Sequence, residues 1–110
     1  MDEAAKKKRS SIARKVTRKT NELYNAMKLE AHVSEVHEKI TSLKYTIEEL
    51  GNSHDEYMDL VDPKDTGKID SEDKWYANYD VKTNQAIKTA RDYIAVVKIA
   101  IDDDKKSKHV

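Results

Sequence analysis

The stretch that decides the fold is residues 33–61, VSEVHEKITSLKYTIEELGNSHDEYMDLV. Its apolar side chains recur in alternating steps of three and four residues, with a single histidine as the exception. The positions on this stripe are Val33, Val36, Ile40, Leu43, Ile47, Leu50, His54, Tyr57 and Val61. Such spacing places every stripe residue on one face of one helix, and that face must be covered by partner helices. The sequence therefore predicts a coiled-coil-like bundle.

Three poor helix formers, Gly51, Asn52 and Ser53, interrupt this stretch. The stripe nevertheless keeps its phase from Leu50 to His54, which a chain reversal would have no reason to preserve. We expect one continuous helix over about residues 34–61, with Ser34 as its N-cap and a weak or bent turn near the glycine. Pro63 ends this helix, because the residue before a proline is disfavoured in the α conformation.

Two further helices are expected on either side of this one. The first covers about residues 4–29 and the third about residues 71–101, where Asp70 or Ser71 can cap its start. Residues 1–3 and 102–110 are predicted to be disordered ends. Because short connections join three long helices, we predict an all-α, antiparallel up-down-up three-helix bundle of coiled-coil type over residues 4–101.

The composition of the 110 residues agrees with a single helical domain. It is 38% charged and 37% hydrophobic, with two glycines and one proline, which suits long amphipathic helices. The chain lacks cysteine, so it forms no disulfide and has no thiolate ligand or nucleophile. The N-terminus does not resemble a signal peptide, and no apolar run is long enough for a membrane span. We expect an intracellular protein, cytoplasmic or nuclear.

Charge is segregated along the chain. Residues 6–19 hold eight Lys or Arg and no acid, while residues 45–73 hold ten Asp or Glu and two lysines. In an up-down-up bundle, the start of the first helix lies beside the end of the second, so residues 6–19 face the acidic stretch from Glu48 to Asp62. The basic residues that form a candidate phosphate-binding face are Lys6, Lys7, Lys8, Arg9, Arg14, Lys15, Arg18 and Lys19. Because no aromatic residues lie among them, a solvated face with intramolecular pairs is favoured over a nucleic-acid-binding module, which stays an alternative.

Residues 62–73 resemble a degenerate EF-hand calcium loop. Asp62 would take position 1, Gly67 position 6 and Asp73 position 12. Lys64 at position 3 opposes a dication, so a helix connection with capping acids is the favoured interpretation. A calcium-responsive domain stays a second alternative.

Residues that carry catalysis are not recognisable in this chain. No two of its four histidines have the spacing that shares a metal on one helix face, and there is no phosphate loop or nucleophile elbow. His54, on the apolar stripe, is interpreted as a core histidine that fixes register. We predict a protein that is not an enzyme and has no cofactor, metal site or small-molecule substrate.

Residues 93–101, YIAVVKIAI, are apolar nearly all round the third helix. This is more than one buried stripe requires, so the segment is either wedged between two neighbours or exposed for association. The candidate partner interface is Tyr93, Ile94, Val96, Val97, Ile99 and Ile101. The predicted function is a non-catalytic protein–protein interaction or assembly module whose partner is a second copy or another helical protein.

Several strings resemble a known family. They are IARKVTRKTN at residues 12–21, SHDEY at residues 53–57, and, after an acidic loop, Tyr79 with AIKTA at residues 86–90. Their order is similar to the N-terminal helical region of Gag-like polyproteins from Pao/BEL retrotransposons, over about residues 10–100. The resemblance implies a structural module of a particle-forming or multi-domain protein, without catalysis of its own. It carries over no binding residues.

Overall fold

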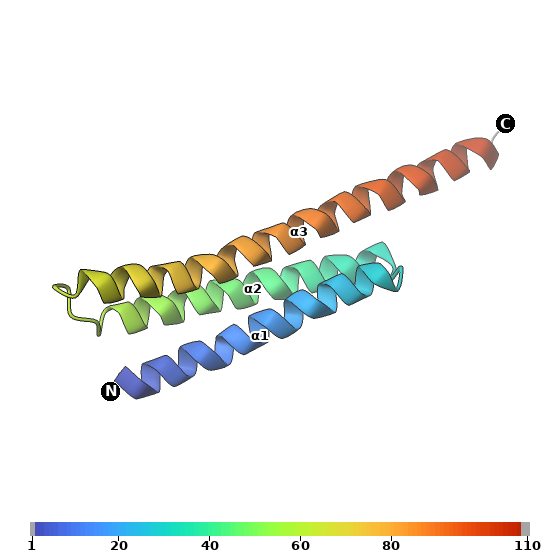
Figure 1. Cartoon of the computed structure of the whole chain (residues 1–110). Coiled ribbons are helices and arrows are strands. Elements are labelled where there is room, and N and C mark those ends of the chain that lie inside the picture. Colours follow the sequence, from blue (N-terminus) through green and yellow to red (C-terminus); the bar gives the residue numbers. More distant parts are fainter. Residues whose placement is uncertain (1, 109–110) are drawn as a thin grey trace.

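The computed structural model describes the backbone of residues 2–108 and the side chains of residues 3–98. Three helices account for most of this part of the chain: α1 (Asp2–Lys28), α2 (Val33–Met58) and α3 (Thr66–Lys108). The described residues contain no strand, and the three helices pack against one another, which confirms the all-helical prediction. Figure 1 shows them side by side, with the chain turning back at both connections.

Side-chain pairs fix how α1 lies against α2. Lys8, near the start of α1, pairs with Glu56 near the end of α2 at 3.1 Å. Further along, Glu22 of α1 lies 3.9 Å from Lys39 of α2. The basic start of α1 and the acidic end of α2 therefore meet at Lys8 and Glu56, as the charge pattern predicts.

The apolar stripe of α2 lies in the core. All nine positions are buried or half-buried, with Val33 and Ile47 the half-buried ones. From α1 and α3, the buried apolar residues that join this core are Ile12, Ala13, Val16, Leu23, Ala26, Ala86, Ile87, Ala90 and Ile94. The predicted stripe is confirmed, and both neighbouring helices cover it.

α2 is continuous through Gly51, as predicted from the unbroken phase of its stripe. The glycine has a packing reason. A Cβ atom built at residue 51 would lie 3.0 Å from the hydroxyl oxygen of Tyr76, which is closer than nearly all real contacts of that kind. The missing side chain thus lets an α3 tyrosine approach the α2 backbone.

α1 ends in a Schellman turn one residue before the predicted end. Glu30 has φ 57°, and its N–H donates to the carbonyl of Met27 at 3.0 Å. The N–H of Ala31 donates to the carbonyl of Ala26 at 2.9 Å, which completes the motif. A glutamate therefore occupies the left-handed position that glycine normally takes.

The boundaries of α2 differ from the prediction of residues 34–61. The helix starts at Val33, because Nδ1 of His32 accepts a hydrogen bond from the N–H of Ser34 at 3.1 Å and so takes the capping role expected of the serine. It ends at Met58. The N–H groups of Leu60 and Val61 then bond to carbonyls three residues earlier, so the chain tightens before the proline.

α3 starts at Thr66, before the predicted start at residue 71. The reason is a cap, since Oδ1 of Asp65 accepts a hydrogen bond from the N–H of Lys68 at 3.1 Å. The helix continues to Lys108, where the sequence predicts an end near residue 101 and a disordered tail. No glycine or proline stands in residues 99–108 to stop it. Met1 and residues 109–110 lie outside the described part.

α3 is much longer than its neighbours, with 43 residues against 27 in α1 and 26 in α2. The hydroxyl of Tyr93 donates to the carbonyl oxygen of Ala31 at 3.1 Å, so the α1–α2 connection lies beside this point of α3. Val97 lines a hollow against the same connection. Residues 98–108, called the α3 overhang, project beyond the other two helices (Figure 1). None of the described helices offers an apolar stretch long enough to cross a bilayer.

Candidate functional site

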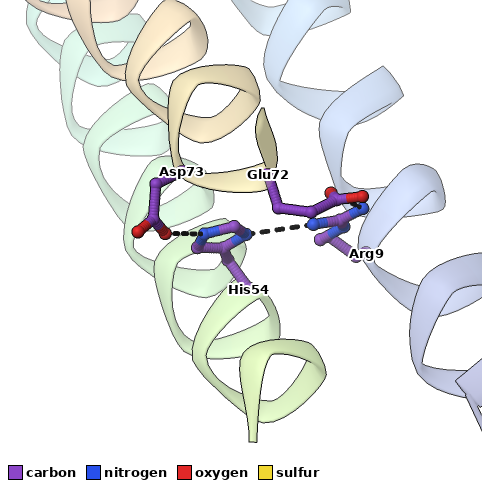
Figure 2. Close-up of polar contacts among 4 residues, drawn as sticks. All are labelled: Arg9, His54, Glu72 and Asp73. Carbon is purple, nitrogen blue, oxygen red and sulfur yellow. Dashed lines mark hydrogen bonds and ion pairs between the residues drawn. The ribbon is translucent and has the colours of Figure 1, made fainter. Parts of the chain in front are cut away.

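A polar cluster lies between the three helices, near the connection of α2 to α3. Its members are Arg9 of α1, His54 of α2, and Glu72 and Asp73 of α3 (Figure 2). We call it the Arg9 cluster. Each helix contributes at least one member, so sliding any helix by a turn would break at least one of its contacts.

Arg9 is the centre of this cluster and is only 2% exposed. One terminal nitrogen, Nη2, lies 2.7 Å from Oε2 of Glu72, and the other donates to Nδ1 of His54 at 3.1 Å. The guanidinium carbon lies 4.0 Å from the ring centre of Tyr57 and 4.2 Å from that of Trp75. A buried cation is thus compensated by one carboxylate and two aromatic faces.

The hydrogen bonds of His54 assign its tautomer. An arginine only donates, so Nδ1 of the imidazole accepts from Arg9 and Nε2 carries the proton. Nε2 then donates to Oδ1 of Asp73 at 3.1 Å. Both ring nitrogens are engaged, so this histidine has no free nitrogen to act as a general base. Ser53 is adjacent in sequence, but its buried hydroxyl has no hydrogen-bond partner among the described residues.

Aromatic rings surround the imidazole. Tyr76 stacks on His54 with ring centres 5.0 Å apart and an angle of 13° between the planes. Burial raises the pKa of the Tyr76 phenol above its ordinary value, and the carboxylates of Asp80 and Asp55 raise it further. A proton is therefore held on the phenol in the folded protein.

The prediction of a phosphate-binding face is wrong for Arg9, which is buried. It lies three residues before Ile12, on the buried stripe of α1, and so points into the bundle. Lys8 is occupied by its pair with Glu56, and Lys19 donates to the hydroxyl of Ser42. The members of the predicted face that remain exposed without these contacts are Lys6, Lys7, Arg14, Lys15 and Arg18.

A groove runs between α1 and α3, and the sequence pattern does not reveal it. One hollow of about 410 Å³ is lined by Val16, Thr17, Thr20, Asn21, Trp75, Asn78, Tyr79, Lys82 and Thr83. A second, of about 460 Å³, is lined by Arg14, Thr17, Arg18, Asn21, Glu22, Asn25 and Tyr79. The two hollows share Thr17, Asn21 and Tyr79, so we treat them together as the α1–α3 groove. Its aromatic residues come from α3 and its arginines from α1.

The candidate partner interface divides between core and surface. Ile94 is buried in the core, because it continues the α3 face that holds Ala86 and Ala90, and it is therefore not available to a partner. Tyr93 and Val97 are half-buried against the α1–α2 connection. Val96 is 66% exposed. The side chains of Ile99 and Ile101 lie outside the described residues.

The position of α3 argues against the calcium-loop alternative. The helix begins at Thr66, so most of residues 62–73 are helical rather than wrapped around an ion. Asp73 is bonded to His54, and Oδ1 of Asp62 accepts from the N–H of Lys64 at 2.9 Å. Among the described residues, no group of three or more histidine or acidic side chains is placed to hold a metal ion.

No protein-family model matches this chain, and no curated protein or solved structure is significantly similar to it. The resemblance to Pao/BEL Gag-like proteins therefore stays a prediction. Part of its first string faces the core, since Ile12 and Val16 are buried. In the second string, His54 and Tyr57 both belong to the surroundings of Arg9.

Proposed function

We propose that this protein is a non-catalytic assembly module, an antiparallel up-down-up bundle of coiled-coil type that binds a second copy of itself through the end of α3. The observation that carries the proposal is the 43-residue length of α3, which leaves residues 98–108 with no neighbouring helix from the same chain (Figure 1). Assembly is also the role that the Gag-like resemblance implies. An intracellular setting, supported by the absence of cysteine, belongs to the same proposal.

The apolar character of this end supports association. Val96 is 66% exposed, although it stands in the run YIAVVKIAI at residues 93–101. Up to Val97, one face of α3 is covered by the α1–α2 connection. Beyond that point the apolar run continues while the covering helices have ended. An apolar helix segment without intramolecular cover is stabilised when a partner helix buries it.

The charge pattern of the overhang favours a second copy as that partner. In sequence, Asp102, Asp103 and Asp104 are followed by Lys105, Lys106 and Lys108. Two overhangs that lie side by side in the same direction and in register would oppose Asp to Asp and Lys to Lys. Opposite directions separate the two acidic triplets and let residues 96–101 of the two copies lie against each other. Charge repulsion therefore favours a homotypic contact with opposed helix directions.

Measuring molar mass by light scattering across a range of concentrations tests the proposal. We expect the full chain to reach the mass of a dimer, and Val96→Lys to raise the dissociation constant by about tenfold or more, equivalent to about 1.4 kcal/mol. The matched control is Val81→Lys on α3, since Val81 is also exposed, at 56%, but lies far from the overhang.

A monomer at every concentration would overturn the homotypic proposal. Equal weakening by Val81→Lys and Val96→Lys would also overturn it, because the effect would then come from added charge rather than from the end of α3. Circular dichroism of both variants should show unchanged helix content, since neither valine is part of the core.

A further inference from the structure

We infer that the α1–α3 groove binds single-stranded nucleic acid, with its phosphates against Arg14, Arg18 and Lys82 and a base stacked on Tyr79. This activity is independent of self-association through α3, and it moves the expected nucleic-acid contact from the exposed face of α1 into the groove. The juxtaposition that carries it is a tyrosine from α3 between cations from both helices.

The charge of the groove suits a phosphate backbone. Three of its lining residues are cationic, Arg14 and Arg18 in one hollow and Lys82 in the other. Its one acidic lining residue is Glu22, whose carboxylate lies 3.9 Å from Lys39 of α2. Within residues 3–98, no ion pair involves the three cations. They are therefore available to neutralise phosphates.

Tyr79 supplies the flat surface that distinguishes a base from a simple anion. It lines both hollows, so a ligand in either one meets its side chain. Trp75 packs against the Tyr79 ring in an edge-to-face contact, with the two ring centres 4.9 Å apart and an angle of 61° between the ring planes. An aromatic ring beside a cationic track is the arrangement that binds single strands, because every base has a face that can stack.

The amides of the groove add the means to bond base edges. Asn21 lines both hollows, while Asn25 and Asn78 line one each, and a side-chain amide offers both donors and an acceptor. A double helix keeps its base faces stacked inside and cannot use the tyrosine. The chemistry therefore selects a single strand over a duplex.

Fluorescence anisotropy with labelled twelve-nucleotide oligouridine and oligothymidine tests the inference on the full chain, at several salt concentrations. We expect both oligonucleotides to bind more tightly than a twelve-base-pair duplex. The double variant Arg14→Gln/Arg18→Gln should lower the slope of log affinity against log salt by about 1.4, the value for two lost phosphate contacts on a single strand. Tyr79→Ala should weaken binding by about fivefold or more, and Tyr79→Phe should retain it.

Two control variants separate the groove from general surface charge. Lys44→Gln/Lys88→Gln removes the same charge from exposed positions outside the groove, and Tyr45→Ala removes an exposed tyrosine of α2. We expect both to bind as the unaltered chain does. The inference is overturned if neither oligonucleotide binds at low salt, if the duplex binds equally well, or if the control variants lose as much affinity as the groove variants. Comparing the affinity for oligouridine with the affinity for oligothymidine then decides whether the groove prefers RNA or DNA.

Discussion

A single guanidinium shows how this small bundle uses a charged residue in its interior. Arg9 is held by Glu72, by the accepting nitrogen of His54 and by the faces of two aromatic rings. Removing one partner of such a buried pair leaves the other charge desolvated and unpaired. Its neighbour Lys8 also forms an ion pair, but at the exposed surface. Adjacent positions on one helix therefore offer a direct comparison of buried and exposed pairing.

We predict that Arg9→Ala lowers the free energy of unfolding by about 3–5 kcal/mol, because Glu72 and His54 lose their partner inside the bundle. Lys8→Ala should cost about 1 kcal/mol or less, since its pair with Glu56 is solvated. Urea unfolding followed by circular dichroism measures both. Equal costs for the two variants would show that burial of the Arg9 cluster adds nothing to its strength.

The raised pKa of the Tyr76 phenol predicts how the stability of the protein changes in alkaline solution. This pKa is raised in the folded protein by burial and by Asp80 and Asp55, so the folded state holds this proton more tightly than the unfolded state. The resulting stability is fully present below the unfolded pKa of about 10 and is lost as pH rises through the folded pKa. We expect Tyr76→Phe to lose less stability than the unaltered chain between about pH 9 and pH 11. Thermal melts at matched pH values measure the difference, and parallel curves for the two proteins would contradict it.

Among the elements, α2 could be predicted from the sequence nearly in full. Its stripe was visible because seven-residue periodicity is a property of consecutive residues. The predicted positions of the helix ends were less accurate. These ends depend on capping residues such as His32 and Asp65, whose hydrogen bonds are decided by local geometry. In α1, the sequence contained a sign that Arg9 is buried, and the prediction overlooked it. Arg9 stands three residues before Ile12, on the same stripe, which marks it as inward-facing.

The remaining features of the candidate sites depend on residues far apart in the chain. Periodicity within one helix does not say which of its residues meets which residue of another helix. Arg9 and Glu72 belong to different helices, and so do Arg14 and Tyr79. The cluster and the groove therefore became visible only in the assembled bundle, although each residue belongs to a helix that the sequence predicted.

The end of α1 gives a prediction at the level of the element. Glu30 adopts φ 57°, a conformation that costs a residue with a Cβ atom free energy and costs glycine little. We expect Glu30→Gly to raise the free energy of unfolding by about 0.5–1 kcal/mol. The same substitution at Glu38, inside α2, should lower it by about 1 kcal/mol, because glycine is unfavourable within a helix. Urea midpoints that shift in the same direction for both variants would contradict the assignment.

The whole molecule is a rod with extents of 70 × 21 × 18 Å, in which one core and one polar cluster join all three helices. Trp75 is the single tryptophan of the chain and lies against Arg9, close to where the helices meet. Its fluorescence therefore reports on the joining of the three helices, while circular dichroism reports on helix content.

We predict that tryptophan fluorescence and circular dichroism give the same urea midpoint of unfolding, because the helices share one core and should unfold together. The midpoints should also agree in Val96→Lys, whose substitution leaves the core intact. A fluorescence transition at clearly lower urea would mean that α3 separates from α1 and α2 before the helices themselves melt, and would contradict a single cooperative unit.

The α3 overhang makes the two ends of this rod unlike each other. When two copies join by the same segment in opposed directions, a two-fold axis relates them and each copy presents the same patch to the other. Such a contact is closed: once both overhangs are covered, neither copy has an unsatisfied patch of that kind. The overhang alone therefore yields pairs, and growth into a filament or a shell requires a second, different surface.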